Sequence, residues 1–272
     1  MDTALKSGSE PAVYLVGAGP GAPDLLTLRA ARLLARADVV FHDALVHPDT
    51  LALAVQAEKI AVGKRCGRHS TAQQFIHKRL ADAARRYRVV VRLKGGDPML
   101  FGRAHEEISF LKSRNIRVEV VPGVTAALAA SAELGISLTR RGLARSVTFV
   151  TPRVGAGEPD SNWARAAAHA DTAAIYMGAG EGPAIAAALI SAGKPPSTPV
   201  AIVESASLED ARVSYGTLQE LPRVSGGPVL ILVGEVYRGA RAASAEPASF
   251  SSETNGFPHS RERRFAGFSE LP

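Results

Sequence analysis

Residues 13–23 read VYLVGAGPGAP, a short apolar run that leads directly into a glycine-rich bend. An apolar, β-branched run bounded by turn residues predicts a buried strand. After the bend, Leu26, Ala30 and Leu33 share one face of a helical pattern, and arginines occupy another face. Pro23 suits the first turn of a helix, so we expect the helix to begin there. A strand, a bend and an amphipathic helix open an α/β fold.

Four more strands of the same kind follow, with helical segments between them. We expect them at residues 38–42, 59–63, 89–93 and 118–121. Strict alternation of apolar strands with helices predicts a parallel five-stranded sheet covered on both faces. One of the intervening helices is predicted from Ser70 and Gln73, whose S-x-x-Q spacing is typical of a capping box.

A second set of strand patterns fills the rest of the ordered chain, at residues 146–150, 172–177, 199–203, 211–218 and 228–234. Strands joined only by a loop are usually antiparallel, so a mixed five-stranded sheet is expected. We therefore predict two α/β domains with a ligand cleft between them. The expected boundaries are a disordered tail over residues 1–11, domains over 12–122 and 123–240, and a disordered tail over 241–272.

Composition narrows the class of protein. The chain has 272 residues, a formal net charge of +6 and one cysteine, Cys66, which excludes an intramolecular disulfide framework. No membrane-spanning run and no signal-peptide pattern are visible, so we expect a cytoplasmic protein without a membrane partner. The positive charge indicates either a solvated basic surface or an anionic partner. Basic stretches are not interleaved with aromatic residues, which argues against nucleic acid.

The glycine bend also satisfies a dinucleotide-binding pattern. Residues 17–22 match G-x-G-x-x-[GA], and Asp43 follows about 20 residues later. However, Pro20 and Pro23 interrupt this stretch, and each proline disfavours helix at the preceding residue. The helix then begins too late for its N–H groups to meet a diphosphate. We favour a close-approach loop at a small-molecule site, with nicotinamide or flavin binding and a purely steric turn as alternatives.

A second glycine loop, KGGDPMLFGR at residues 94–103, follows the fourth strand. Two glycines at the carboxyl end of a strand let a ligand approach the backbone. Together with GAGPG, this loop and the stretches VGKRCGRHS (62–70), VVPGVTAA (120–127) and GISLTRRGLARSVTFVTPR (135–153) resemble the tetrapyrrole methylase family. The resemblance runs from about Ala12 to Val236. KR-x-GRHS and RLKGGDP are similar to those of members that methylate uroporphyrinogen III.

The resemblance implies that S-adenosylmethionine binds between the two domains. The family positions for this cofactor fall on Pro20, Gly95, Gly96, Asp97, Leu100, Thr125, Ala126, Met177 and Ala206. Glycines would expose backbone groups to the cofactor, and Thr125 opens a predicted helix whose amides would attract its carboxylate. Met177 would pack against adenine, or is simply a core residue.

The resemblance also implies methylation of uroporphyrinogen III at carbons 2 and 7, through precorrin-1 to precorrin-2. It points to Asp43 as proton acceptor and Lys64 as proton donor, at the ends of neighbouring strands; a structural salt bridge is the alternative. His42 stands where the family usually has tyrosine. The substrate carries eight carboxylates, for which Arg68 and Arg103 are the candidate partners.

Other functions remain open at this point. They are methylation of another precorrin, methylation of RNA, and nicotinamide-dependent oxidoreduction. A homodimer is implied by the resemblance, and the product would enter sirohaem or cobalamin synthesis. The histidines of residues 42–47 and the run HEE at 105–107 lack metal-protease spacing, so no metal site is expected.

Overall fold

The computed structural model describes residues 12–62, 69–155, 157, 159, 161–224 and 227–240. Its first sheet has the strand order β3-β2-β4-β1-β5, and every pair is parallel. The strands are β1 (Ala12–Gly17), β2 (Val39–His42), β3 (Glu58–Ala61), β4 (Val89–Lys94) and β5 (Arg117–Val121). This confirms the predicted parallel sheet.

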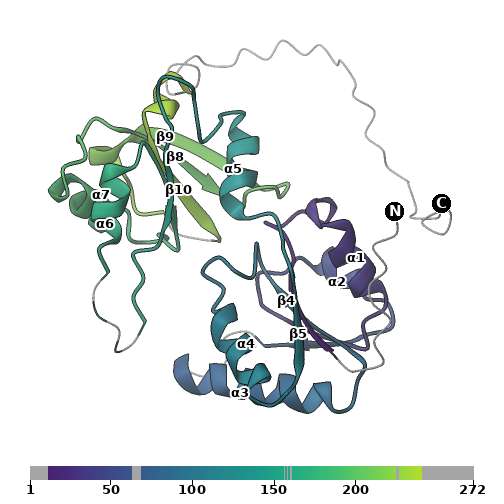
Figure 1. Ribbon diagram of the computed structural model, residues 1–272. Coiled ribbons are helices and arrows are strands. Elements are labelled where there is room, and N and C mark those ends of the chain that lie inside the picture. The colour runs from purple at the N-terminus through teal and green to yellow at the C-terminus, as the bar shows by residue number, and fades with distance from the viewer. Residues whose placement is uncertain are drawn as a thin grey trace, which may run out of the picture.

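Helices cover both faces of this sheet (Figure 1). They are α1 (Leu28–Ala35), α2 (Pro48–Ala52), α3 (His69–Ala84) and α4 (Ala104–Lys112). Successive strand residues point to opposite faces, so Tyr14 and Val16 pack in the cluster that contains α1 residues. Val13 and Leu15 pack in the cluster that contains residues of α3 and α4. This alternation is why the strands are apolar throughout.

Two predicted helix starts are wrong in detail. Residues Pro23–Leu25 form only a 3₁₀ turn, and α1 begins at Leu28, where Thr27 accepts the Ala30 N–H at 3.2 Å. A threonine hydroxyl supplies the cap that a proline cannot. Helix α3 begins at His69, so Ser70 lies inside it rather than at its cap. The late start of α1 agrees with the argument against a diphosphate-binding turn.

The second sheet has the order β6-β7-β10-β8-β9, with β6 and β7 parallel and the other pairs antiparallel. Its strands are β6 (Val147–Val150), β7 (Thr172–Tyr176), β8 (Pro199–Glu204), β9 (Arg212–Thr217) and β10 (Val229–Gly234). Helices α6 (Trp163–His169) and α7 (Gly182–Ser191) lie over one face, and α5 (Ala126–Leu134) over the other (Figure 1). The predicted mixed sheet is therefore confirmed.

None of the helices within the described residues has the length and apolar composition that crossing a membrane requires.

Candidate functional site

Three glycine loops contact one another where β4, β1 and β5 end. A Cβ added to Gly17 would lie 2.6 Å from the Gly123 Cα and 2.7 Å from the Gly96 carbonyl oxygen. These distances leave no room for a side chain at Gly17, and a Cβ at Gly123 would collide with the backbones of Gly96 and Gly17. The loops can meet only because Gly17 and Gly123 are glycine. The strand order makes this possible, since β4, β1 and β5 are direct neighbours.

The bend after β1 is bonded to the bend after β4. The Gly96 N–H donates to the Gly19 carbonyl at 2.6 Å, and the Gly19 N–H donates back to Gly96 at 3.3 Å. Both glycines have positive φ, +75° at Gly19 and +66° at Gly96. Pro20 follows, half-buried. A Cβ added to Gly96 would meet nothing within 4 Å, so the other side of this residue is open.

Asp97 joins the loop after β4 to the loop after β5. Its Oδ2 accepts the Gly123 N–H at 2.9 Å, and its Oδ1 accepts the Met99 N–H at 2.8 Å. The Asp97 carbonyl accepts the N–H of half-buried Leu100 at 3.3 Å. Both carboxylate oxygens of Asp97 are thus occupied by the protein's own backbone, which gives this residue a role in holding the loops.

Two predicted residues of the second half, Thr125 and Ala126, lie beside Tyr176, at the end of β7. The Thr125 Oγ1 lies 2.7 Å from the Tyr176 hydroxyl, which also accepts the Ala127 N–H at 3.1 Å. Burial raises the pKa of Tyr176, so the hydroxyl stays protonated. The Ala127 N–H at the start of α5, expected to be open to a carboxylate, is therefore already bonded. Ala126 is half-buried beside it.

Met177 and Ala206 occupy different surroundings. Met177 has a left-handed backbone, φ +57°, and a side chain that is 39% exposed, so it is not a core residue. Ala206 is 8% exposed and packs in the core of the second half.

The two halves touch at these loops. The Phe101 and Tyr176 ring centroids are 5.1 Å apart. On the other side of the contact, the Ala22 N–H donates to the Ser207 hydroxyl at 3.1 Å. Predicted cofactor residues from the two halves of the chain thus lie on loops that approach each other.

Asp43 follows β2 and is held by a buried arginine. The register pairs Phe41 with Arg92, and side chains alternate between faces, so Asp43 projects on the same face as Arg92. The Arg92 Nη2 donates to the Asp43 Oδ1 at 2.6 Å. Arg92 is 3% exposed and Asp43 is 32% exposed, so the carboxylate lies at the edge of the buried region.

Behind Arg92 lies a carboxylate with no exposure to solvent, Glu107 of α4. Its Oε1 accepts the Arg92 Nε–H at 3.2 Å, and the Lys94 Nζ donates to both of its oxygens at 3.2 Å. The Gln73 amide donates to Oε1 at 3.3 Å rather than capping α3. Burial and the neighbouring Arg92 lower the pKa of Lys94, and burial lowers that of His77 beside Gln73.

The remaining predicted residues are Lys64, Arg68 and Arg103. Lys64 and Arg68 lie outside the described residues. Arg103 is 47% exposed and makes two 2.7 Å hydrogen bonds to Glu106, three residues along the chain. The described residues contain no group of three His, Cys, Asp or Glu side chains arranged to hold a metal ion.

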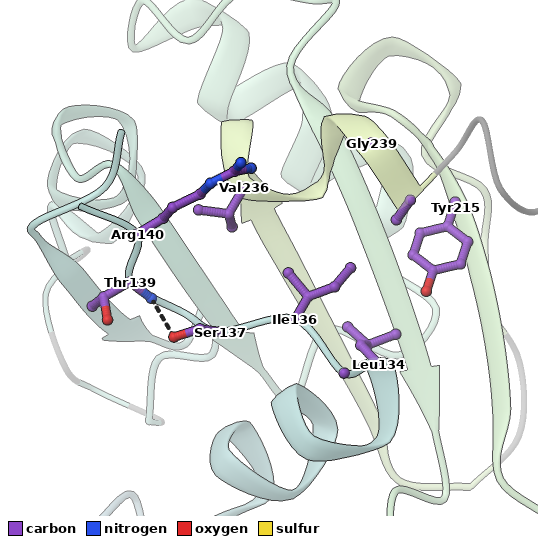
Figure 2. Close-up of a pocket in the computed structure, with 10 residues that line it drawn as sticks. Leu134, Ile136, Ser137, Thr139, Arg140, Tyr215, Val236 and Gly239 are labelled. Carbon is purple, nitrogen blue, oxygen red and sulfur yellow. Dashed lines mark hydrogen bonds between the residues drawn. The ribbon is translucent and has the colours of Figure 1, made fainter. Parts of the chain in front are cut away.

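A cavity of about 680 Å³ lies elsewhere, in the second half of the chain (Figure 2). Its labelled walls include Leu134, Ile136, Tyr215 and Val236, with Arg140 at one side. The Ser137 hydroxyl there accepts the Thr139 N–H at 3.3 Å. None of the predicted site residues lines it, so we assign the candidate site to the strand ends, where the predicted residues meet.

Sequence reasoning missed Arg92, Glu107 and Tyr176. A signal for Arg92 was present, because Arg92 and Lys94 are charged residues two positions apart in the otherwise apolar strand VVVRLK. Two charges on one face of a buried strand require buried partners. No comparable signal marks Glu107, which has Glu106 as its neighbour in sequence.

Comparison with known proteins adds independent evidence. Residues 12–222 match the family model of tetrapyrrole (corrin/porphyrin) methylases. A siroheme synthase of Pseudomonas fluorescens is 46% identical over 232 residues, which cover 83% of this chain and 50% of that protein. The chain spans about half the length of the curated relatives it matches.

Solved structures match over nearly their whole length. A uroporphyrin-III C-methyltransferase from Thermus thermophilus, complexed with S-adenosylhomocysteine, is 44% identical with a TM-score of 0.75, covering 84% of this chain and 99% of that one. A cobalt precorrin-4 methyltransferase is 29% identical with a TM-score of 0.70, covering 83% and 95%. The family model matches most of the chain, and the chain belongs to the tetrapyrrole methylases.

Proposed function

We propose that this chain is a uroporphyrinogen-III C-methyltransferase, which methylates carbons 2 and 7 and yields precorrin-2 through precorrin-1. The observation that carries the proposal is the likeness to the Thermus enzyme, 44% identical over 99% of that chain. The glycine loops after β1, β4 and β5 would hold the cofactor near Asp43, the proposed base. The product would enter sirohaem or cobalamin synthesis.

The residues proposed to hold S-adenosylmethionine suit a ligand that lies against the backbone. A Cβ at Gly96 would meet nothing within 4 Å, and one at Gly95 would meet only Leu45, at 3.4 Å. We assign to this site Pro20, Gly95, Gly96, Asp97 and Leu100 from the first half, and Thr125, Ala126, Met177 and Ala206 from the second. When bound, S-adenosylmethionine would supply an electrophilic methyl group for transfer from sulfur to a pyrrole carbon, with S-adenosylhomocysteine as the leaving group.

Asp43 is proposed as the proton acceptor. Methylation of the macrocycle must be followed by loss of a proton, for which a placed base is useful. The Asp43 carboxylate is one-third exposed and anchored by Arg92 at 2.6 Å, so one side is fixed while the other can reach a substrate. Lys64, which follows β3 in the sequence, is proposed as the proton donor.

Arginines are proposed to bind the substrate's carboxylates. The chain carries a net charge of +6, and guanidinium groups bind carboxylates in pairs of hydrogen bonds. Arg103 now pairs with Glu106 at the surface. An exposed pair contributes only about 0–1 kcal/mol, so a substrate carboxylate can replace Glu106 there. Arg68 is the second candidate.

The test is incubation of the purified protein with S-adenosylmethionine and uroporphyrinogen III. Precorrin-2, or its oxidised product sirohydrochlorin, is expected in the absorbance spectrum, and failure to form either contradicts the proposal. Ligand binding separates this function from nicotinamide chemistry. S-adenosylhomocysteine at about 100 times its Kd should stabilise the fold by about 2.7 kcal/mol, whereas NAD should not change the Tm.

A second candidate is methylation of a different precorrin. It is favoured by the cobalt precorrin-4 methyltransferase likeness, at 29% identity and a TM-score of 0.70. Competing precorrin substrates in the same assay distinguish the two. RNA methylation has no comparable support, and salt-sensitive RNA binding would be its signature.

We further propose that the chain divides into domains at 12–122 and 123–240, and that it acts in the cytoplasm as a homodimer on a small-molecule tetrapyrrole. Light scattering after size-exclusion chromatography tests the dimer.

A further inference from the structure

Glu107 is surrounded only by hydrogen-bond donors. Its Oε1 accepts from Arg92 at 3.2 Å, Lys94 at 3.2 Å and Gln73 at 3.3 Å, and its Oε2 accepts from Lys94 at 3.2 Å. A carboxylate can accept from all of them, whereas an amide would place its own N–H₂ against a donor. The Glu107 side chain has no exposure to bulk solvent, which therefore supplies no substitute partner.

These contacts fix the plane of the Arg92 guanidinium. Its Nε bonds Glu107, and its Nη1 donates to the carbonyls of Leu93 at 3.1 Å and Phe41 at 3.4 Å. Because the guanidinium is rigid and planar, holding Nε and Nη1 also fixes the direction of Nη2. That remaining nitrogen donates to Asp43 at 2.6 Å.

The four charges balance inside the molecule. Asp43 and Glu107 carry negative charge, and Arg92 and Lys94 carry positive charge. Burial of a charge without a partner is costly, so loss of the Glu107 charge would leave two cations sharing one partly exposed carboxylate. Arg92 would then lose the charged partner that holds its Nε, and Asp43 would lose its fixed orientation.

We propose that Glu107 is a positioning residue, which acts through Arg92 to hold the Asp43 carboxylate in the orientation that accepts the substrate's proton. The Glu107 side chain is completely buried, so it takes no direct part in the reaction. This inference depends on the proposed function, in which Asp43 is the proton acceptor.

A double-mutant cycle tests it, with kcat for methylated product measured in the full chain. Glu107→Gln should lower kcat by about 10- to 100-fold, as expected for a reacting group displaced by about 1 Å. The Kd for S-adenosylhomocysteine should stay within about twofold, because the glycine loops are untouched. In the Asp43→Asn background, adding Glu107→Gln should change kcat by less than about twofold.

The outcomes separate the two proposals. Losses that multiply in the double variant, or a Glu107→Gln variant with wild-type kcat, would overturn the positioning role while leaving the proposed function intact. A wild-type protein that forms no methylated product would overturn the proposed function itself. Glu119→Gln is the matched control, because Glu119 pairs with Arg117 at 3.5 Å on β5, outside the cluster, and should keep wild-type kcat.

Arg92→Lys provides a second route if Glu107→Gln does not fold, as judged by circular dichroism. Lysine keeps the charge, but its single ammonium cannot bond both Glu107 and Asp43 in the geometry of the guanidinium. The same loss of kcat is expected, and it too should vanish in the Asp43→Asn background. Wild-type kcat in Arg92→Lys would overturn the proposal.

Discussion

The Asp97 carboxylate accepts the Gly123 backbone N–H at 2.9 Å, although the two residues lie 26 positions apart in the chain. Asp97 follows β4 and Gly123 follows β5, and β1 runs between these two strands. The bond therefore closes the junction over the end of β1. It also couples the first half of the chain to the segment that leads into the second, since α5 begins three residues after Gly123.

Replacing Asp97 with asparagine should loosen this junction. One of the two backbone N–H groups would face the amide N–H₂ instead of an acceptor, and a polar group that loses its partner costs about 1–3 kcal/mol. We expect that loss in the free energy of unfolding from urea titrations, and about a tenfold weaker Kd for S-adenosylhomocysteine by calorimetry. Asp82→Asn on the exposed face of α3 should change neither quantity. If Asp97→Asn and Asp82→Asn have the same unfolding free energy and the same Kd, Asp97 does not hold the two loops together.

Gly17→Ala should force the loops apart. Its Cβ would lie 2.6 Å from the Gly123 backbone, which cannot move aside as a flexible side chain would. Overpacking of this kind costs about 1–3 kcal/mol, so the urea midpoint of unfolding should fall. The binding of S-adenosylhomocysteine should also weaken. Gly239→Ala is the matched control, because a Cβ there meets nothing within 4 Å. If Gly17→Ala has the same urea midpoint as the wild type, the loops do not approach each other as closely as described.

Tyr176→Phe should weaken the start of α5. The change keeps the ring that packs 5.1 Å from Phe101 but removes the acceptor of the Ala127 N–H. We expect a loss of about 1 kcal/mol in the free energy of unfolding. The control is Tyr87→Phe, whose hydroxyl donates to Glu58 at the surface, where water replaces it. If Tyr176→Phe lowers the unfolding free energy less than Tyr87→Phe does, the Tyr176 hydroxyl does not stabilise the start of α5.

Acid should remove the contribution of Asp171 to stability. Hydrogen bonds from the Arg145 N–H, then from the Ser146 hydroxyl and N–H, lower the pKa of Asp171. Since its pKa is lower in the folded than in the unfolded chain, its stabilisation is complete above about pH 4 and disappears as the pH falls through the folded value. The difference in unfolding free energy between wild type and Asp171→Asn should be constant from pH 5 to 7 and shrink below pH 4. A difference that stays the same in acid would contradict this.

The sequence predicted the positions of the strands better than the starts of the helices or the contacts between loops. All ten strands were predicted within a few residues, because β-branched apolar runs between turn residues are a local signal. The start of α1 was placed too early, because Pro23 signals a first turn equally well for a 3₁₀ turn and for a helix. The resemblance to a family pointed to Asp97 and Thr125 as site residues. It did not predict that Asp97 bonds to Gly123 or that Thr125 bonds to Tyr176.

By itself, the sequence determined the two sheets, the glycine loops and the family, since each of these is a pattern of neighbouring residues. Only the tertiary structure decided that Asp43 pairs with Arg92 and that Glu107 lies behind it. The physical reason is that β2 lies next to β4 rather than β1. That order brings together residues 49 positions apart in the chain, which no pattern of neighbouring residues specifies.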